Sequence, residues 1–260
     1  MSTRIENVFA KDRAAFVAYI MGGDPNLAAA QDVMNALPDA GVDIIELGFP
    51  FTDPMADGPV IEEAGIRARE AGTTLASVIG MAKTFRKTND HTPIILMGYA
   101  NPVYHIGYET FSDVASKAGV DGAIIVDLPP EEDGPLRDAM DAKGMSLIRL
   151  ATPTTDANRL PKVVSGSSGF VYYVSMNGVT GGALTSGGSV RDQVARVKEA
   201  ANLPVVVGFG VKTPERAAEI ARDADGVVVG TAIVKALHED GKDAALALVR
   251  ALADATHSAK

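Results

Sequence analysis

Residues 44–59 carry the stretch IIELGFPFTDPMADGP, an apolar run that ends in a loop rich in glycine and proline. The run at residues 44–47 has the composition of a strand buried on both faces, as in a parallel sheet. Glu46 interrupts this run, and two further carboxylates, Asp53 and Asp57, follow in the loop. A charged group in an apolar strand is costly unless it is paired or used, so the stretch indicates acid–base chemistry. The structural alternative is that Glu46 pairs with a cation while Asp53 and Asp57 cap turns.

Similar short apolar runs recur along the chain and are typical of buried parallel strands. With the run above, the expected strands are residues 16–21, 44–47, 93–97, 123–126, 146–150, 170–174, 205–208 and 227–229. Segments with helical spacing and good helix formers lie between them. These expected helices are residues 26–37, 61–71, 109–118, 131–143, 156–164, 191–201, 214–222 and 244–255.

About eight strand–helix repeats in roughly 250 residues predict an α/β fold, the (β/α)8 TIM barrel. We expect one domain over residues 1–260, with an extra helix at 5–12 and an inserted helix at 75–87. An open, doubly wound sheet would also alternate, but its first strand usually leads into a G-x-G-x-x-G turn. The first strand here ends in the letters MGGDP at residues 21–25, which do not match.

Composition narrows the classes of function. The chain has no cysteine and a net charge of −9, so thiolate metal sites are excluded and nucleic-acid binding is disfavoured. Its four histidines are too dispersed along the chain to predict a metal site. The N-terminus lacks the apolar core of a signal peptide, and no apolar run is long enough for a membrane span. We expect a cytoplasmic protein that binds neither membrane nor nucleic acid.

Glycine-rich turns follow the last three expected strands, at residues 178–182, at 208–210 and at Gly230-Thr231. Glycines there let backbone N–H groups approach an anion closely. A short helix expected at residues 232–234 would add the dipole of its N-terminus. Barrel enzymes often hold phosphate after strands seven and eight, so the three turns together predict a phosphate site. Taken singly, each glycine has the simpler role of ending a strand.

Aromatic side chains stand near other expected strand ends: Tyr19, Tyr99, Tyr172 and Phe209. Each alone is typical of barrel filling. Together with the acids and glycines they indicate a long pocket, with phosphate at one end, a flat apolar ring at the other and carboxylates between. No lysine stands at a strand end for a Schiff base, and neither a P-loop nor H-E-x-x-H is present. A cofactor-free reaction is therefore favoured.

These motifs match a known family. The chain resembles the α-subunit of tryptophan synthase over nearly its whole length, and residues 46–59 are the most specific part of the match. The other matching motifs are residues 23–25, 97–102, 127–129, 178–181, 208–211 and 230–234. The resemblance implies a TIM-barrel lyase of tryptophan biosynthesis. Its retro-aldol reaction would cleave indole-3-glycerol phosphate to indole and glyceraldehyde 3-phosphate.

The resemblance also implies roles for the two acids. The family's catalytic glutamate matches Glu46, the general acid that protonates C3 of the indole and afterwards the base on the glycerol hydroxyl. A group that first gives and then takes a proton needs a pKa near neutral. Desolvation in an apolar barrel mouth would raise the pKa of Glu46 in that direction. The family's catalytic aspartate matches Asp57, which would accept the indole N–H and stabilise positive charge on the ring.

Further residues carry over from the same family. Four would hold the phosphate: Gly181, Gly210, Gly230 and Thr231. Five would line the indole pocket: Tyr19, Tyr99, Ile124, Tyr172 and Phe209. The loop at residues 175–189 would act as a lid in which Thr180 positions Asp57. Some relatives carry arginine where this chain has Met176, so that position is not needed for the chemistry.

A partner is implied as well, because the family's α-subunit docks on a β-subunit in an α–β–β–α complex. Pyridoxal phosphate would belong to that β-subunit, and this chain would need no cofactor. The loops Asp53–Met55 and Asn101–Tyr104 would form the docking surface. Three alternatives stay open: another cofactor-free phosphosugar barrel, a stand-alone indole-releasing lyase, and a catalytically silent barrel that activates a partner enzyme. An indole-glycerol-phosphate synthase would need a catalytic lysine at a strand end, which the chain lacks.

Overall fold

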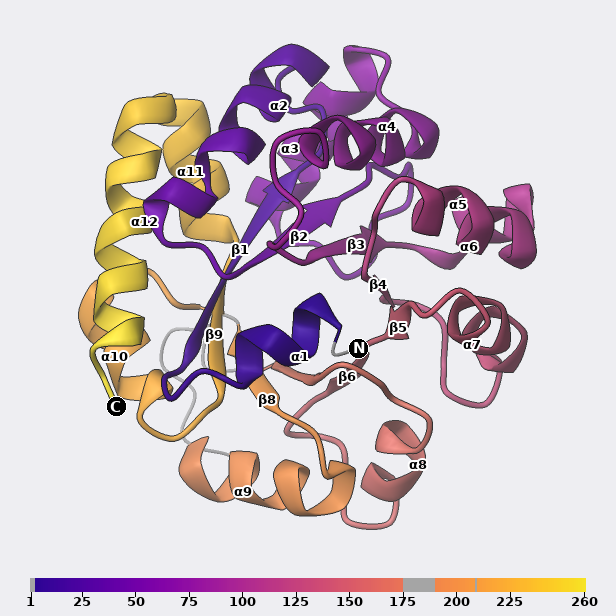
Figure 1. Cartoon of the computed structure of the whole chain (residues 1–260), viewed down its shortest axis with the longest axis vertical. Helices are drawn as coiled ribbons and strands as arrows, with labels where there is room; N and C mark the ends of the chain where they lie inside the picture. Colours follow the sequence, from indigo (N-terminus) through magenta and orange to yellow (C-terminus); the bar gives the residue numbers. More distant parts are fainter. Residues whose placement is uncertain (1–2, 175–189, 209) are drawn as a thin grey trace.

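The computed structural model describes residues 3–174, 190–208 and 210–260. Its strands form one parallel sheet that curls into a nearly closed barrel, with helices around the outside (Figure 1). The sheet order is β5-β4-β3-β2-β1-β9-β8-β7-β6. The strands are β1 Ala15–Met21, β2 Ile44–Gly48, β3 Ile94–Gly98, β4 Gly122–Ile125, β5 Ser146–Leu147, β6 Arg149–Ala151, β7 Val171–Val174, β8 Val205–Gly208 and β9 Gly226–Val229. The predicted TIM barrel is confirmed.

Apart from α1, the helices cover the outer face of the sheet, and the two extra helices expected from the sequence are both present. The helices are α1 Arg4–Phe9, α2 Leu27–Ala36, the 3-10 turn η1 Pro38–Ala40, α3 Pro59–Glu70, α4 Leu75–Phe85, α5 Ala100–Ile106, α6 Tyr108–Lys117, α7 Gly134–Asp141, α8 Leu160–Val164, α9 Val190–Ala201, α10 Pro214–Ala221, α11 Thr231–Glu239 and α12 Lys242–His257. Among the described helices, none has the length and apolar character that a membrane span requires.

The fifth expected strand is broken in two, which gives nine strands in the described ranges where eight were expected. Ser146 and Leu147 pair with β4, whereas residues 149–151 pair with β7 on the other side. Ile148 lies at the break, where its N–H still donates to Ala123. The segment 146–150 therefore changes its partner strand part-way along. As a result, β4 and β6 share no ladder of backbone hydrogen bonds.

Three expected segments differ in length or kind. The helix expected at 156–164 is only α8, because the Asp156 carboxylate accepts the N–H groups of Asn158 and Arg159 and holds a turn there. The helix expected at 131–143 is the shorter α7, with a proline in its first turn. The short helix expected at 232–234 is the nine-residue α11.

The expected loop at Asn101–Tyr104 is wrong, because these residues lie in helix α5. Pro102 is the third helical residue, where a backbone N–H has no intrahelical partner to lose. The N–H of Ala100 at the start of the helix donates to the Asp127 carboxylate at 2.7 Å. The cap therefore comes from the loop after β4, beyond the local sequence.

The barrel interior is apolar and is closed at one end by helix α1, which lies across the centre of the ring in Figure 1. Ile5 and Val8 of this helix join the interior cluster, and Phe9 packs against Phe170 with ring centroids 5.7 Å apart. This plug covers the end where strands begin. The opposite end, where strands finish, is the face on which barrel enzymes place their sites.

A hydrogen bond of one kind recurs at the end of the barrel where strands begin. A side chain just before one strand accepts a backbone N–H near the start of another strand. Three pairs tie neighbouring strands together: Asp43 with Phe16, Asp121 with Ile94 and Asp225 with Val205, at 2.8–3.0 Å. The fourth pair, Ser168 with Leu147 at 3.2 Å, joins the segment before β7 to β5. The three aspartates also form ion pairs with cations from outside the strands. This end of the barrel therefore serves stability.

Replacing Asp43 by asparagine is expected to cost about 2 kcal/mol of unfolding free energy at pH 7, because the buried carboxylate loses its charge-assisted hydrogen bonds to the partly exposed Arg13 and His257. Burial alone would raise the Asp43 pKa, but hydrogen bonds from His257, Arg13 and the Phe16 N–H hold it well below its usual range. The stabilisation is therefore present above pH 4 and lost as the pH falls further. Urea unfolding of wild type and Asp43→Asn at pH 7 and pH 3 measures both effects. Exposed Asp39→Asn is the control, and a difference independent of pH would contradict this account.

Candidate active site

Glu46 lies in the middle of β2, and its side chain is buried within the barrel. Only 1% of the residue is exposed, and neither carboxyl oxygen has a hydrogen-bond partner among the described residues. Burial raises the pKa of Glu46 from 4.5 to about 8. The carboxyl group is therefore mostly protonated near neutral pH and can both give and take a proton. The structural alternative of an ion pair between Glu46 and a cation is wrong for the described part of the chain.

Asp57 lies in the loop after β2, two residues before helix α3. The Tyr99 hydroxyl donates to Asp57 Oδ1 at 2.9 Å and accepts the Ala56 N–H at 3.2 Å, so one side chain holds both the carboxylate and its loop. The ring of Phe51 stacks on Tyr99 with centroids 5.4 Å apart. Burial raises the pKa of Asp57, and the hydrogen bond from Tyr99 opposes this rise. The carboxylate is thus half-buried and fixed in direction.

Both acids face one cavity of about 450 Å³ at the end where strands finish. Its walls combine the acids, two tyrosines, apolar side chains and two glycine turns. The lining residues are Tyr19, Glu46, Ala56, Asp57, Gly58, Ile61, Met97, Tyr172, Gly210, Val211, Lys212, Val228, Gly230 and Thr231. Gly230 is the N-cap residue of α11, so the free N–H groups of this helix start at the cavity wall. The cavity therefore joins an anion-binding edge to a pair of carboxyl groups.

Two tyrosines reach the cavity by lying over glycines of neighbouring strands. A Cβ on Gly48 would lie 2.2 Å from the Tyr19 hydroxyl, and a Cβ on Gly208 would lie 2.2 Å from the Tyr172 hydroxyl. Both rings are at least nine-tenths buried. The glycines that end β2 and β8 are thus needed for ring placement, in addition to any role in ending the strands.

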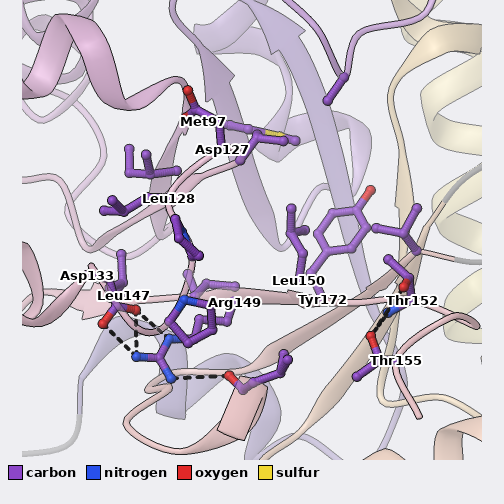
Figure 2. Close-up of a pocket in the computed structure, with 18 of the residues that line it drawn as sticks. Met97, Asp127, Leu128, Asp133, Leu147, Arg149, Leu150, Thr152, Thr155 and Tyr172 are labelled. Atoms are coloured by element: carbon purple, nitrogen blue, oxygen red, sulfur yellow. Dashed lines mark hydrogen bonds and ion pairs between the residues drawn. The ribbon is translucent and has the colours of Figure 1, made fainter. Parts of the chain in front are cut away.

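A second cavity of about 550 Å³ adjoins the first and shares Ala56, Met97 and Tyr172 with it. Figure 2 shows its apolar part, where Leu150 and Tyr172 stand on neighbouring strands, and its polar part around Arg149. Arg149 donates to both oxygens of Asp133 at 2.6 and 2.7 Å. This buried ion pair joins β6 to the start of α7 at the place where β4 and β6 have no ladder. The two cavities together form an elongated mouth.

Most of the predicted site residues come together. Seven line the first cavity: Tyr19, Glu46, Asp57, Tyr172, Gly210, Gly230 and Thr231. Tyr99 contacts the site through Asp57. Ile124 is fully buried in the interior cluster and lines neither cavity. Thr180, Gly181, Phe209, Met176 and the expected lid at 175–189 lie outside the described residues.

Sequence reasoning missed several lining residues. Met97 and Val211 stand inside matched motifs at strand ends, so their positions were a usable signal. Ile61 lies on α3, and only its place on the side of that helix that faces the cavity could have marked it as a lining residue. Lys212 is the one cation among the described residues that line the first cavity, and it stands two residues after Gly210 in the turn after β8. The described residues contain no cluster of three or more histidine and carboxylate groups that could hold a metal ion.

A family model described as tryptophan synthase alpha chain matches residues 5–260. The chain belongs to the tryptophan synthase alpha chain family. A tryptophan synthase alpha chain from Novosphingobium aromaticivorans is 53% identical over 261 residues, covering 99% of this chain and 98% of that protein. The reaction of the chain is therefore the α reaction of tryptophan biosynthesis, cleavage of indole-3-glycerol phosphate to indole and glyceraldehyde 3-phosphate. The stand-alone lyase and the silent barrel are not favoured.

Solved structures agree in fold with this tryptophan synthase alpha chain family member. The subunit alpha of tryptophan synthase from Legionella pneumophila str. Paris superimposes with a TM-score of 0.89 at 37% identity, covering 98% of this chain and 99% of that chain. A chain of tryptophan synthase from Mycobacterium tuberculosis gives a TM-score of 0.90 at 35% identity, covering 99% of both.

Proposed function

We propose that this chain carries out the α reaction with Glu46 as the proton-transfer group and Asp57 as the partner of the indole nitrogen. One observation carries the proposal: a buried carboxyl group that has no hydrogen-bond partner in the described part of the chain, with a pKa of about 8, faces the same cavity as a second, hydrogen-bonded carboxylate. Retro-aldol cleavage needs the indole ring to leave as a stable species. Acid at one side of the ring and negative charge at the other meet that need.

In the first step, the Glu46 carboxyl group gives its proton to C3 of the indole, which turns the ring into an electron-accepting indolenine. The carboxylate left behind then takes the proton of the hydroxyl on the carbon bonded to C3. The bond between that carbon and C3 breaks as a carbonyl forms. Its electron pair returns to the ring, so indole and glyceraldehyde 3-phosphate leave and Glu46 is protonated again. A pKa near neutral suits both proton transfers.

Asp57 accepts the ring N–H and balances the positive charge that grows on nitrogen when C3 is protonated. Tyr99 holds the carboxylate in direction and, by donating to it, favours its ionised form. The family resemblance also gives Thr180 a part in positioning Asp57. The ring itself would lie against Tyr19 and Tyr172, with Tyr99 and Phe209 as further members of the indole pocket, whereas Ile124 lies deeper, in the interior cluster beneath it.

The phosphate is held by backbone N–H groups of Gly210, Gly230 and Thr231, together with Gly181. The start of α11 adds its dipole, and the exposed Lys212 adds a charge at the same edge. Gly210 has φ of +76°, a conformation that favours glycine.

Replacing Gly210 by aspartate is expected to weaken binding of a phosphorylated ligand at least about tenfold more than replacement by asparagine does. The two side chains have the same shape and the same backbone strain, so their difference measures repulsion between like charges. Calorimetric titration with an indole-alkyl phosphate that cannot be cleaved gives both constants. Equal affinities in the two variants would mean that the phosphate does not bind at this turn.

A β-subunit that carries pyridoxal phosphate is the proposed partner, in an α–β–β–α complex, and this chain itself needs no cofactor. Two exposed apolar side chains in the two expected docking segments support this surface: Met55 is 82% exposed and Tyr104 on α5 is 72% exposed. The surface would comprise the loop Asp53–Met55 and helix α5. We propose that residues 1–260 act as one barrel domain, and the cytoplasmic location expected from the sequence stays a prediction.

An assay of purified protein with indole-3-glycerol phosphate, with and without a β-subunit, tests the proposed function. We expect indole and glyceraldehyde 3-phosphate in equal amounts without added metal or cofactor. Faster release with the β-subunit would support the docking surface. Absence of indole release under both conditions would contradict the proposal.

A further inference from the structure

A turn after β1 touches the elements that carry both proposed acids. It comprises Gly22, Gly23 and Asp24, within a sequence motif that the chemistry above does not use. On the side of Glu46, the N–H of Gly22 donates to the carbonyl of Gly48 at 2.8 Å. A Cβ on Gly22 would lie 2.8 Å from the same oxygen, so the turn and the end of β2 are in backbone contact.

On the side of Asp57, the turn is joined to helix α3. Arg67 donates through Nε and Nη2 to the two oxygens of Asp24, at 2.7 and 2.8 Å. The Asp24 side chain is 9% exposed and that of Arg67 is 22% exposed. Gly23 has φ of +81°, and a Cβ there would lie 2.1 Å from Thr73 Oγ1, so the turn also packs against the segment after α3.

Helix α3 begins at Pro59, two residues after Asp57, and its 12 residues make a rod about 18 Å long. Any tilt of this rod displaces the loop that holds Asp57. A bidentate contact between a guanidinium and a carboxylate fixes direction as well as distance. The Asp24–Arg67 pair therefore restrains the rod relative to the turn, and the turn is itself fixed to β2.

We infer that Asp24 and Arg67 are positioning residues that hold α3, and with it Asp57, at the working distance from Glu46. The inference rests on the proposed roles of the two acids. The turn after β1 thus contributes to catalysis without touching the substrate. A misplacement of about 1 Å in such an arrangement can cost about a hundredfold in rate, so the effect is measurable.

The test is Arg67→Met in the full chain, assayed for indole release. We expect kcat to fall about tenfold to a hundredfold while KM changes less than about threefold, because the substrate contacts remain. Arg69→Met is the matched control, since Arg69 is exposed on the same helix. Arg67→Lys keeps the charge and one hydrogen bond, so it should recover part of kcat.

Two readouts separate positioning from a purely structural role. The double variant Asp24→Asn/Arg67→Met should have a kcat no lower than Arg67→Met alone, because both changes break one contact. The kcat–pH profile of Arg67→Met should also shift its alkaline limb toward lower pH, since a displaced α3 lets water reach Glu46. A merely structural contact would lower Tm and leave both kinetic readouts at wild-type values.

Wild-type kcat in folded Arg67→Met would overturn the inference, whatever the change in Tm. If Arg67→Met does not fold, Arg67→Lys carries the test, with a several-fold loss of kcat expected at near-wild-type Tm and an unchanged kcat overturning it. The acids are tested separately. Activity retained in Glu46→Gln or Asp57→Asn contradicts the proposed function, whereas loss in both with normal kcat in the Arg67 variants contradicts only the positioning role.

Discussion

Glu46→Gln is expected to lower kcat for indole release about a thousandfold or more. Glutamine has the shape of glutamic acid but cannot give a proton to C3, and positioned acid–base groups contribute about 10²–10⁴-fold. Binding of a non-cleavable indole-alkyl phosphate should stay within a few-fold of wild type. Single-turnover assays and calorimetry measure the two quantities. Retained turnover would remove Glu46 from its role, and Glu63→Gln on the exposed face of α3 is the control.

The stability of Glu46→Gln relative to wild type should increase as the pH rises. Folding wild type above pH 4.5 requires Glu46 to take up a proton, or to bury its charge above pH 8. The advantage of glutamine therefore grows between about pH 4.5 and pH 8 and then levels off. We expect a Tm higher by roughly 5 °C at pH 8.5 and a smaller difference at pH 5. Equal Tm values at both pH values would contradict the burial of an unpaired carboxyl group.

Asp57→Asn is expected to lower kcat about a hundredfold to a thousandfold with little change in KM. The amide can still accept a hydrogen bond from the ring N–H, but it carries no charge to balance the indolenine nitrogen. Steady-state kinetics with indole-3-glycerol phosphate measure the split between kcat and KM. Glu70→Gln, at the exposed end of α3, is the control.

A rise in KM alone would mean that Asp57 only binds substrate, and the charge-balancing role would be wrong. The hydrogen bond from Tyr99 offers a second check on the same group. Tyr99→Phe should reproduce a fraction of the Asp57→Asn loss, because it frees the direction of the carboxylate without removing its charge. A larger loss than in Asp57→Asn would assign Tyr99 a separate function.

Apolar runs located the strands to within a residue or two, because strands buried on both faces leave a continuous hydrophobic signature. The break at Ile148 had no such signature. Leucines continue the pattern on both sides of it, at Leu147 and Leu150, and the change from β4 to β7 as partner depends on the curvature of the whole barrel. Helix α5 was also missed, since its cap is Asp127, supplied by a loop 27 positions further along the chain.

At the site, residue types and motif spacing brought together Glu46, Asp57 and the glycine turns. The sequence alone could not decide between a used and an ion-paired Glu46, because that depends on which side chains reach the barrel interior. Nor did it show the contact between Arg67 and Asp24, which are 43 positions apart. An arginine on a helix usually marks a solvated face, and only the packing of α3 against the first turn gives it a different meaning.

The protonation state of Glu46 is the most direct test of the account. Carbon-13 NMR of protein labelled at the glutamate side-chain carboxyl carbons, compared with Glu46→Gln to identify the signal, gives its titration curve. We expect a midpoint near pH 8, with the carboxyl group neutral at pH 7. A midpoint near 4.5 would mean that Glu46 is ionised at working pH, and the proposed proton donation to the indole ring would be wrong.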